Sequence, residues 1–91
     1  MPKIELEIPD YNKYIGLQYS WEDGYNISTD LQDNAVVISA NKAGLISLAK
    51  QMLTLANAPY DGAHFHYDDY GCLEEGSLEI IICRMKEEQG R

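Results

Sequence analysis

Two histidines and five carboxylates stand close together in residues 63–82, which read AHFHYDDYGCLEEGSLEIII. The histidines are separated by one residue, and no Lys or Arg falls among the carboxylates. Imidazole nitrogens and carboxylate oxygens bind transition metals, and the same two groups can also transfer protons. A set of carboxylates without neutralising cations is equally typical of a surface that binds a basic partner. The stretch therefore predicts a metal site, an acid/base pair or a binding surface.

A metal site would be centred on the two histidines. Alternation along a strand places His64, His66 and Asp68 on one face, with successive side chains about 7 Å apart. The two imidazoles can then share one ion, with Asp68 or Glu79 as a third ligand, whereas zinc takes three or four ligands. The sequence supplies no clear fourth ligand, and two histidines in this spacing are a weak signal. We therefore expect no bound metal and no other cofactor.

Catalysis is a second alternative. His66 with Asp68 or Asp69 can act as an acid/base pair, because a carboxylate orients an imidazole and raises its pKa. The chain contains neither a GxSxG elbow nor a glycine-rich phosphate loop. Cys83 lies in an apolar strand, IIIC, which is typical of an inert buried thiol. A domain of this size also leaves little room for an enclosed pocket, so we expect a protein that is not an enzyme.

The distribution of charge favours a binding surface. The 91 residues include fifteen Asp and Glu against seven Lys and Arg, which gives a formal net charge of -8. No basic residue falls between Lys50 and Arg84 or between Lys13 and Lys42, and both segments carry several carboxylates. Such a field repels phosphate and anionic lipid, and it attracts a basic protein. We therefore expect binding to neither nucleic acid nor membranes.

The exposed part of this surface is predicted on the loop after the histidine strand, where no apolar pattern calls for burial. Tyrosine combines apolar area with a hydroxyl group and little side-chain entropy, so Tyr70 is expected to be an interface anchor. A second acidic turn lies directly after Trp21. The predicted partner-binding residues are Asp68, Asp69, Tyr70, Glu74, Glu75, Glu22 and Asp23.

One helix is expected to position these residues against a sheet. Asn41 is a suitable N-cap, and the apolar periodicity predicts a helix over about residues 42–56. Its apolar stripe is expected to lie on the sheet. The stripe consists of Leu45, Leu48, Ala49, Met52, Leu53 and Ala56.

Strand patterns account for most of the remaining chain. They occur at residues 4–8, 14–21, 25–30, 35–40, 62–68 and 77–85. Asp23-Gly24 and Asp33-Asn34 predict tight turns between neighbouring strands. The unbroken apolar run of residues 35–40 predicts a strand covered on both faces. The expected fold is a single α+β domain, residues 1–91, with a mostly antiparallel sheet of five or six strands and one long helix packed on one face.

The second half of the chain resembles a known family. The helix NKAGLISLA, the strand HFHYD and the segment LEEGSLEIII are similar to the immunity protein 32 family of bacterial polymorphic toxin systems. The resemblance covers residues 41–84, and the first forty residues do not match it. It implies a small α+β protein that protects its own cell by binding and neutralising a cognate toxin, often a nuclease. No inhibitory residue is carried over from the family.

Together, the residues and the resemblance predict an acidic inhibitor that occludes the active site of a basic toxin, with a nuclease as the expected class. Its two cysteines form no C-x-x-C pair, which agrees with a reducing compartment, and we expect the protein in the cytoplasm. Three alternatives stay open. One is a small metal-binding protein or enzyme centred on the histidine strand, and another is a homodimeric interaction module joined through an exposed strand edge. The third is an immunity protein whose toxin is not a nuclease.

Overall fold

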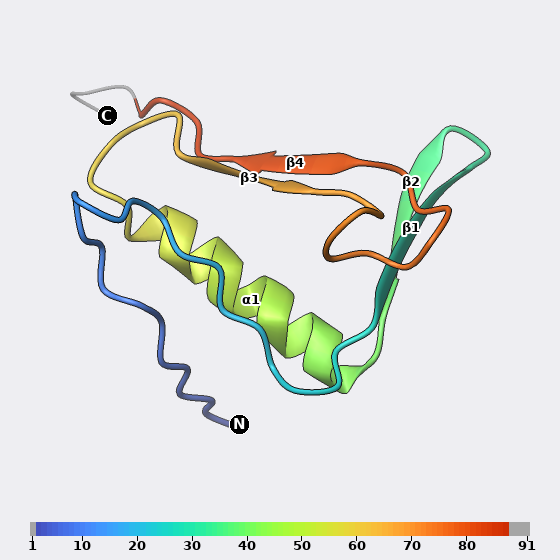
Figure 1. The fold of residues 1–91 in the computed structure, drawn as a ribbon, viewed down its shortest axis with the longest axis horizontal. Helices are drawn as coiled ribbons and strands as arrows, with labels where there is room; N and C mark the ends of the chain where they lie inside the picture. The colour runs from blue at the N-terminus through green and yellow to red at the C-terminus, as the bar shows by residue number, and fades with distance from the viewer. Residues whose placement is uncertain (1, 88–91) are drawn as a thin grey trace.

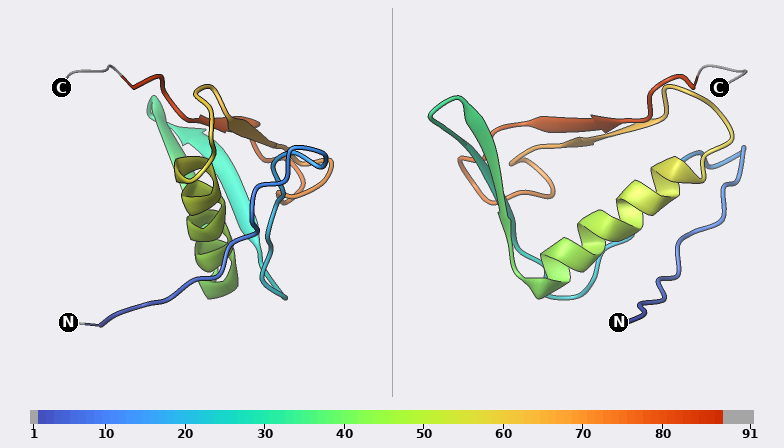
Figure 2. Two further views of the ribbon diagram at one scale, coloured as in Figure 1. Left: turned by 90° about the vertical axis from the view of Figure 1, so that its left-hand side faces the viewer. Right: turned by 180° about the vertical axis from the view of Figure 1, so that it is seen from behind.

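The computed structural model describes residues 2–87, which form one helix and two separate two-stranded antiparallel sheets (Figure 1). The elements follow in the order β1 (Ile27–Gln32), β2 (Ala35–Ala40), α1 (Lys42–Ala56), β3 (His64–Tyr67) and β4 (Ile80–Cys83). In opposite views of the molecule, the helix and the two sheets form three sides of a triangle (Figures 1 and 2).

The α+β class is confirmed, but the single sheet of five or six strands is wrong. Residues 2–87 contain four strands, with β1 paired to β2 and β3 paired to β4. Segments 4–8 and 14–21 form no strand, and between residues 2 and 26 there is only one isolated bridge, from Asn12 to Gly16. An alternating pattern indicates which face of a strand each side chain would occupy. It does not ensure that a neighbouring strand is present to pair with the backbone of that segment.

The β1–β2 sheet is closed by the turn that the sequence predicts. Asp33 and Asn34 have positive φ angles of 48° and 69°, the conformation of a type I′ hairpin turn, which Asp and Asn tolerate. The prediction that residues 35–40 are covered on both faces is wrong. β2 is an outer strand with mostly exposed side chains, so its apolar run reflects the β propensity of Val and Ile and not burial.

The helix α1 has the predicted bounds and the predicted cap. The side chain of Asn41 accepts a hydrogen bond from the backbone N–H of Gly44 at 2.8 Å. The same side chain donates to the carbonyl of Gly24 and accepts the N–H of Asn26. The N-cap therefore also fastens the turn before β1 to the start of the helix.

The face that α1 buries is not its apolar stripe. Of the stripe only Leu48 is buried, whereas Leu45, Met52 and Leu53 are 57%, 48% and 46% exposed. The expectation that the stripe lies on a sheet is therefore wrong. The residues that α1 buries are Gly44, Ser47, Leu48, Gln51, Thr54 and Leu55.

Polar side chains on the buried face of α1 bind the irregular segment before β1. Ser47 Oγ accepts the backbone N–H of Glu22 at 2.8 Å, and Gln51 Nε2 donates to the carbonyl of Ser20 at 3.4 Å. Residues 20–22 belong to no strand, and a buried backbone group without a partner costs about 1–3 kcal/mol. The helix therefore turns these side chains inward, and the apolar stripe is left outside.

The hydrophobic core lies among α1, β1 and the inner face of β3. Phe65 and Tyr67 fill it from β3, and His64 and His66 lie on the outer face, as the alternation predicts. The buried apolar residues are Ile27, Leu48, Leu55, Ala58, Ala63, Phe65, Tyr67 and Leu73.

Candidate protein-binding interface

The acidic loop, residues 68–76, joins β3 to β4 and carries five of the predicted binding residues. Hydrogen bonds within the loop determine its shape. The Asp68 carboxylate accepts the N–H of Tyr70 at 3.1 Å, and the Asp69 carboxylate accepts the N–H of Gly76 at 3.1 Å across the loop. These hydrogen bonds from the loop backbone to Asp68 and Asp69 therefore fix the conformation of the loop that carries Tyr70, Glu74 and Glu75.

The acidic loop and the residues after it are also fastened to the outer edge of β1. The N–H of Glu74 donates to the carbonyl of Ile27 at 2.8 Å, and the N–H of Leu78 donates to the carbonyl of Thr29 at 3.1 Å. The hydroxyl oxygen of Ser77 accepts the N–H of Thr29 at 3.2 Å. The polypeptide of residues 74–78 thus occupies the β1 edge of the β1–β2 sheet.

Three exposed side chains of the acidic loop take no part in its internal hydrogen bonds; Asp69 is also exposed, but its carboxylate bonds Gly76. Tyr70 is 97% exposed, although tyrosine is on average only partly exposed in globular proteins. Glu74 and Glu75 are exposed, and within residues 2–87 their carboxylates make no ion pair or hydrogen bond. The predicted loop residues therefore divide into two aspartates that shape the loop and three side chains that it presents.

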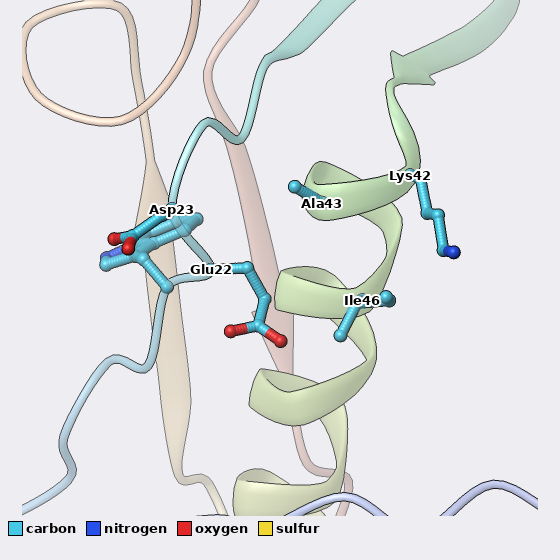
Figure 3. A pocket seen from close by; sticks show the side chains of 6 residues that line it. Glu22, Asp23, Lys42, Ala43 and Ile46 are labelled. Atoms are coloured by element: carbon cyan, nitrogen blue, oxygen red, sulfur yellow. The ribbon is translucent and has the colours of Figure 1, made fainter.

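The second acidic turn divides in the same way. Figure 3 shows the Glu22 side chain directed toward α1 and the Asp23 side chain on the other side of the turn. The Glu22 carboxylate lies 3.4 Å from Lys50 Nζ, which neutralises it, whereas Asp23 is exposed and has no such pair within the described residues. An open depression of about 500 Å³ beside this turn is lined by Trp21, Glu22, Asp23, Lys42, Ala43 and Ile46 (Figure 3).

Aromatic rings connect the two acidic regions, a feature that sequence reasoning missed. Trp21 stacks on Tyr25 with ring centroids 4.4 Å apart. Trp21 and Asp68 line one surface depression, and Tyr25 and Glu74 line another. The only sequence signal is that Trp21 and Tyr25 flank the turn in WEDGY. We define the acidic face as Trp21, Asp23, Tyr25, Tyr70, Glu74 and Glu75.

The two histidines form a second polar surface, and His66 also lines the depression that Trp21 and Asp68 share. The rings of His64 and His66 are 5.0 Å apart on the outer face of β3. His66 Nδ1 is 3.8 Å from the Glu79 carboxylate, and His64 Nδ1 is 2.9 Å from the carbonyl oxygen of Gly62. Asp68 does not join them, because its carboxylate turns into the acidic loop. Within residues 2–87 no three His, Cys, Asp or Glu side chains are grouped so that they can share an ion.

We expect untagged protein purified without chelator to contain well under one equivalent of zinc, copper, nickel or iron. The imidazoles of His64 and His66 supply only two of the three or four ligands that zinc takes. Elemental analysis of the purified protein checks this expectation. A stoichiometric ion that is lost in the His66→Ala variant would contradict it and would restore the metal-site alternative.

The two cysteines occupy different environments. Cys83 is exposed on the outer face of β4, opposite His64 in the register with β3. The prediction of a buried thiol is therefore wrong. Cys72 is half-buried in the acidic loop. Burial raises the pKa of the Cys72 thiol, which keeps the thiol protonated near neutral pH and makes it a weak nucleophile.

Comparison with known proteins identifies the family. The model of the family described as Immunity protein 32 matches residues 35–85, which is 51 of the 91 residues. The chain belongs to the immunity protein 32 family. The resemblance drawn from residues 41–84 is thereby confirmed. No curated protein and no solved structure matches the chain.

The immunity protein 32 match covers only part of the acidic face. It includes the acidic loop with Tyr70, Glu74 and Glu75, whereas Trp21 and Asp23 precede it. The matched residues also include β2, α1 and both strands of the β3–β4 sheet. Within residues 2–87, the single helix α1 is not long and apolar enough to cross a membrane.

Proposed function

We propose that this chain is an immunity protein that binds a cognate bacterial toxin and occludes its active site. Membership of the immunity protein 32 family supports the immunity role. The acidic face supports the proposed mode of binding, because its loop presents Tyr70 and two glutamates that are unpaired within residues 2–87. In this role the protein acts by binding and not by catalysis, in the cytoplasm of the cell that it protects.

The proposed partner is a basic toxin, and a nuclease is the class that fits best. A nuclease holds phosphates with Arg and Lys side chains, and carboxylates form charge-assisted hydrogen bonds with the same side chains. Glu74 and Glu75 offer such a site carboxylates that no described residue pairs with, and the acidic loop carries no cation. Their field, together with the net charge of -8, speeds the encounter with a positively charged partner.

Co-expression tests the proposed function directly. The toxin domain encoded beside this gene is expected to stop the growth of a bacterial host, and production of this chain is expected to restore growth. The purified chain should form a complex with the toxin and abolish its nuclease activity at one equivalent. Restored growth without a physical complex would contradict neutralisation by binding. A complex with a toxin that cleaves neither DNA nor RNA would contradict the nuclease class alone.

Tyr70→Ala is expected to weaken toxin binding mainly through faster dissociation. An aromatic anchor near the centre of an interface contributes about 2 kcal/mol or more, which is roughly a 30-fold change in affinity. Because the Tyr70 ring is almost fully exposed, its removal leaves the fold intact. Binding kinetics on a sensor surface with the cognate toxin measure both rate constants.

Tyr14→Ala is the matched control for this variant. The Tyr14 ring is 87% exposed, but it lies outside the acidic face on the segment before Trp21. Its removal is expected to leave both rate constants unchanged. An equal loss of affinity in the two variants would remove Tyr70 from the role of anchor.

A further inference from the structure

Among the described residues, the β1–β2 sheet has its free edge at β2. The outer edge of β1 is occupied by residues 74–78, through the bonds to Ile27 and Thr29. Within residues 2–87, by contrast, no hydrogen bond from outside the β1–β2 sheet reaches residues 35–40. One edge of this small sheet is therefore covered and the other is open.

The strand register shows which backbone groups the open edge presents. The backbone groups of Ile27 and Thr29 point away from β2, because they bond to residues 74–78. Two residues that face each other in an antiparallel pair direct their backbone groups in the same sense, inward or outward. Ile38 faces Thr29, so its N–H and C=O point outward, and by alternation those of Val36 and Ala40 do so too.

Apolar side chains accompany these unpaired backbone groups. Val36 is 54% exposed and Ile38 is 42% exposed, and Leu31, which faces Val36 in the register, is also exposed. Natural edge strands are commonly protected by a charged side chain, a proline or a bulge. β2 has none of these, because its sequence is AVVISA and its register with β1 is unbroken.

We propose that β2 pairs antiparallel with β2 of a second copy of this chain, so that two hairpins form one four-stranded sheet. Charge favours this partner. β2 carries no charged residue, so two copies can meet there without local repulsion, although each chain has a net charge of -8. A basic partner gains no attraction from such an edge. Antiparallel pairing of two identical strands is also self-complementary, as a two-fold interface requires.

The dimer leaves the acidic face available. The acidic loop lies at the β1 edge of the sheet, and the second copy joins at the β2 edge. Each dimer therefore presents two acidic faces. This inference stands independently of the proposed function, because the dimer forms without a toxin.

Light scattering on the full, untagged chain tests the proposal. The measured mass is expected to approach twice 10.3 kDa as the protein concentration rises. Ile38→Pro removes one outward N–H and no bond to β1, and Val36→Lys places a positive charge from each copy on the shared strand edge. Each change is expected to weaken dimerisation by about tenfold or more. Val36→Thr keeps a neutral, β-branched side chain and is expected to leave the dimer intact.

Met52→Lys is the control for a change from an apolar to a charged side chain. Met52 is 48% exposed on α1, and its replacement is expected to leave the dimer intact. Circular dichroism verifies folding. If Ile38→Pro does not fold, the comparison of Val36→Lys with Met52→Lys tests the proposed dimer. A wild-type chain that is monomeric at its highest soluble concentration would overturn the proposal. A dimer that Met52→Lys dissociates and Val36→Lys does not would also overturn it.

Discussion

Reversing the charge of two residues, as Glu74→Lys with Glu75→Lys, is expected to slow association with the toxin by about ten- to a hundredfold at low salt. Both carboxylates are exposed and unpaired within the described residues, so their field reaches an approaching basic surface. Salt screens this field within about 8–10 Å at physiological ionic strength. The difference between the wild-type chain and the variant should therefore shrink as salt is added. Stopped-flow kinetics at two salt concentrations measure both effects.

Glu5→Lys with Glu7→Lys is the matched control for this charge reversal. It changes the net charge by the same amount at two exposed glutamates outside the acidic face. A much smaller effect on association is expected there. Equal slowing by both double variants would show that net charge, and not the acidic face, steers the encounter. Asp69 is a poor site for charge reversal, because its carboxylate accepts the N–H of Gly76 and shapes the acidic loop.

Leu48→Ala is expected to lower the free energy of unfolding by about 2–5 kcal/mol, whereas Met52→Ala should cost less than about 1 kcal/mol. The apolar periodicity of α1 assigns both residues to the same stripe. In the folded chain, however, Leu48 is 5% exposed in the core and Met52 is 48% exposed. Truncation of Leu48 leaves a cavity, and truncation of Met52 does not.

Urea denaturation followed by circular dichroism measures both free energies of unfolding. Both variants are compared in the Val36→Lys background, in which the proposed dimerisation is expected to be weakened and to contribute less to the difference. Equal large losses in the two variants would contradict the helix orientation and would place the whole apolar stripe against the core. A large loss for Met52→Ala alone would reverse the assignment.

Local structure was predictable from the sequence because local interactions determine it. The bounds of α1 follow from its propensity and from the side chain of Asn41, which bonds a backbone group three residues away. The turn at Asp33-Asn34 follows from the positive φ angles that these two residue types tolerate. The split of β3 into buried aromatic residues and exposed histidines follows from the alternation of side chains along a strand.

The acidic loop was predictable as a region but not residue by residue. Charge and the lack of an apolar pattern point to residues 68–76 as exposed. Nothing in the composition distinguishes Asp69, which bonds Gly76, from Glu75, which is unpaired within the described residues. That difference depends on the path of the backbone, because only a carboxylate that lies close to a backbone N–H can accept a hydrogen bond within the loop.

The tertiary structure alone decided which face of α1 is buried and which segments share the acidic face. Residues 20–22 find no strand to pair with, so their backbone groups bond to Ser47 and Gln51. This pairing turns a polar side of the helix inward, and Trp21 and Tyr25, which flank the acidic turn, lie beside the acidic loop. A hydrophobic pattern cannot encode such an arrangement, because the need to pair a buried backbone group belongs to a distant segment and not to the helix itself.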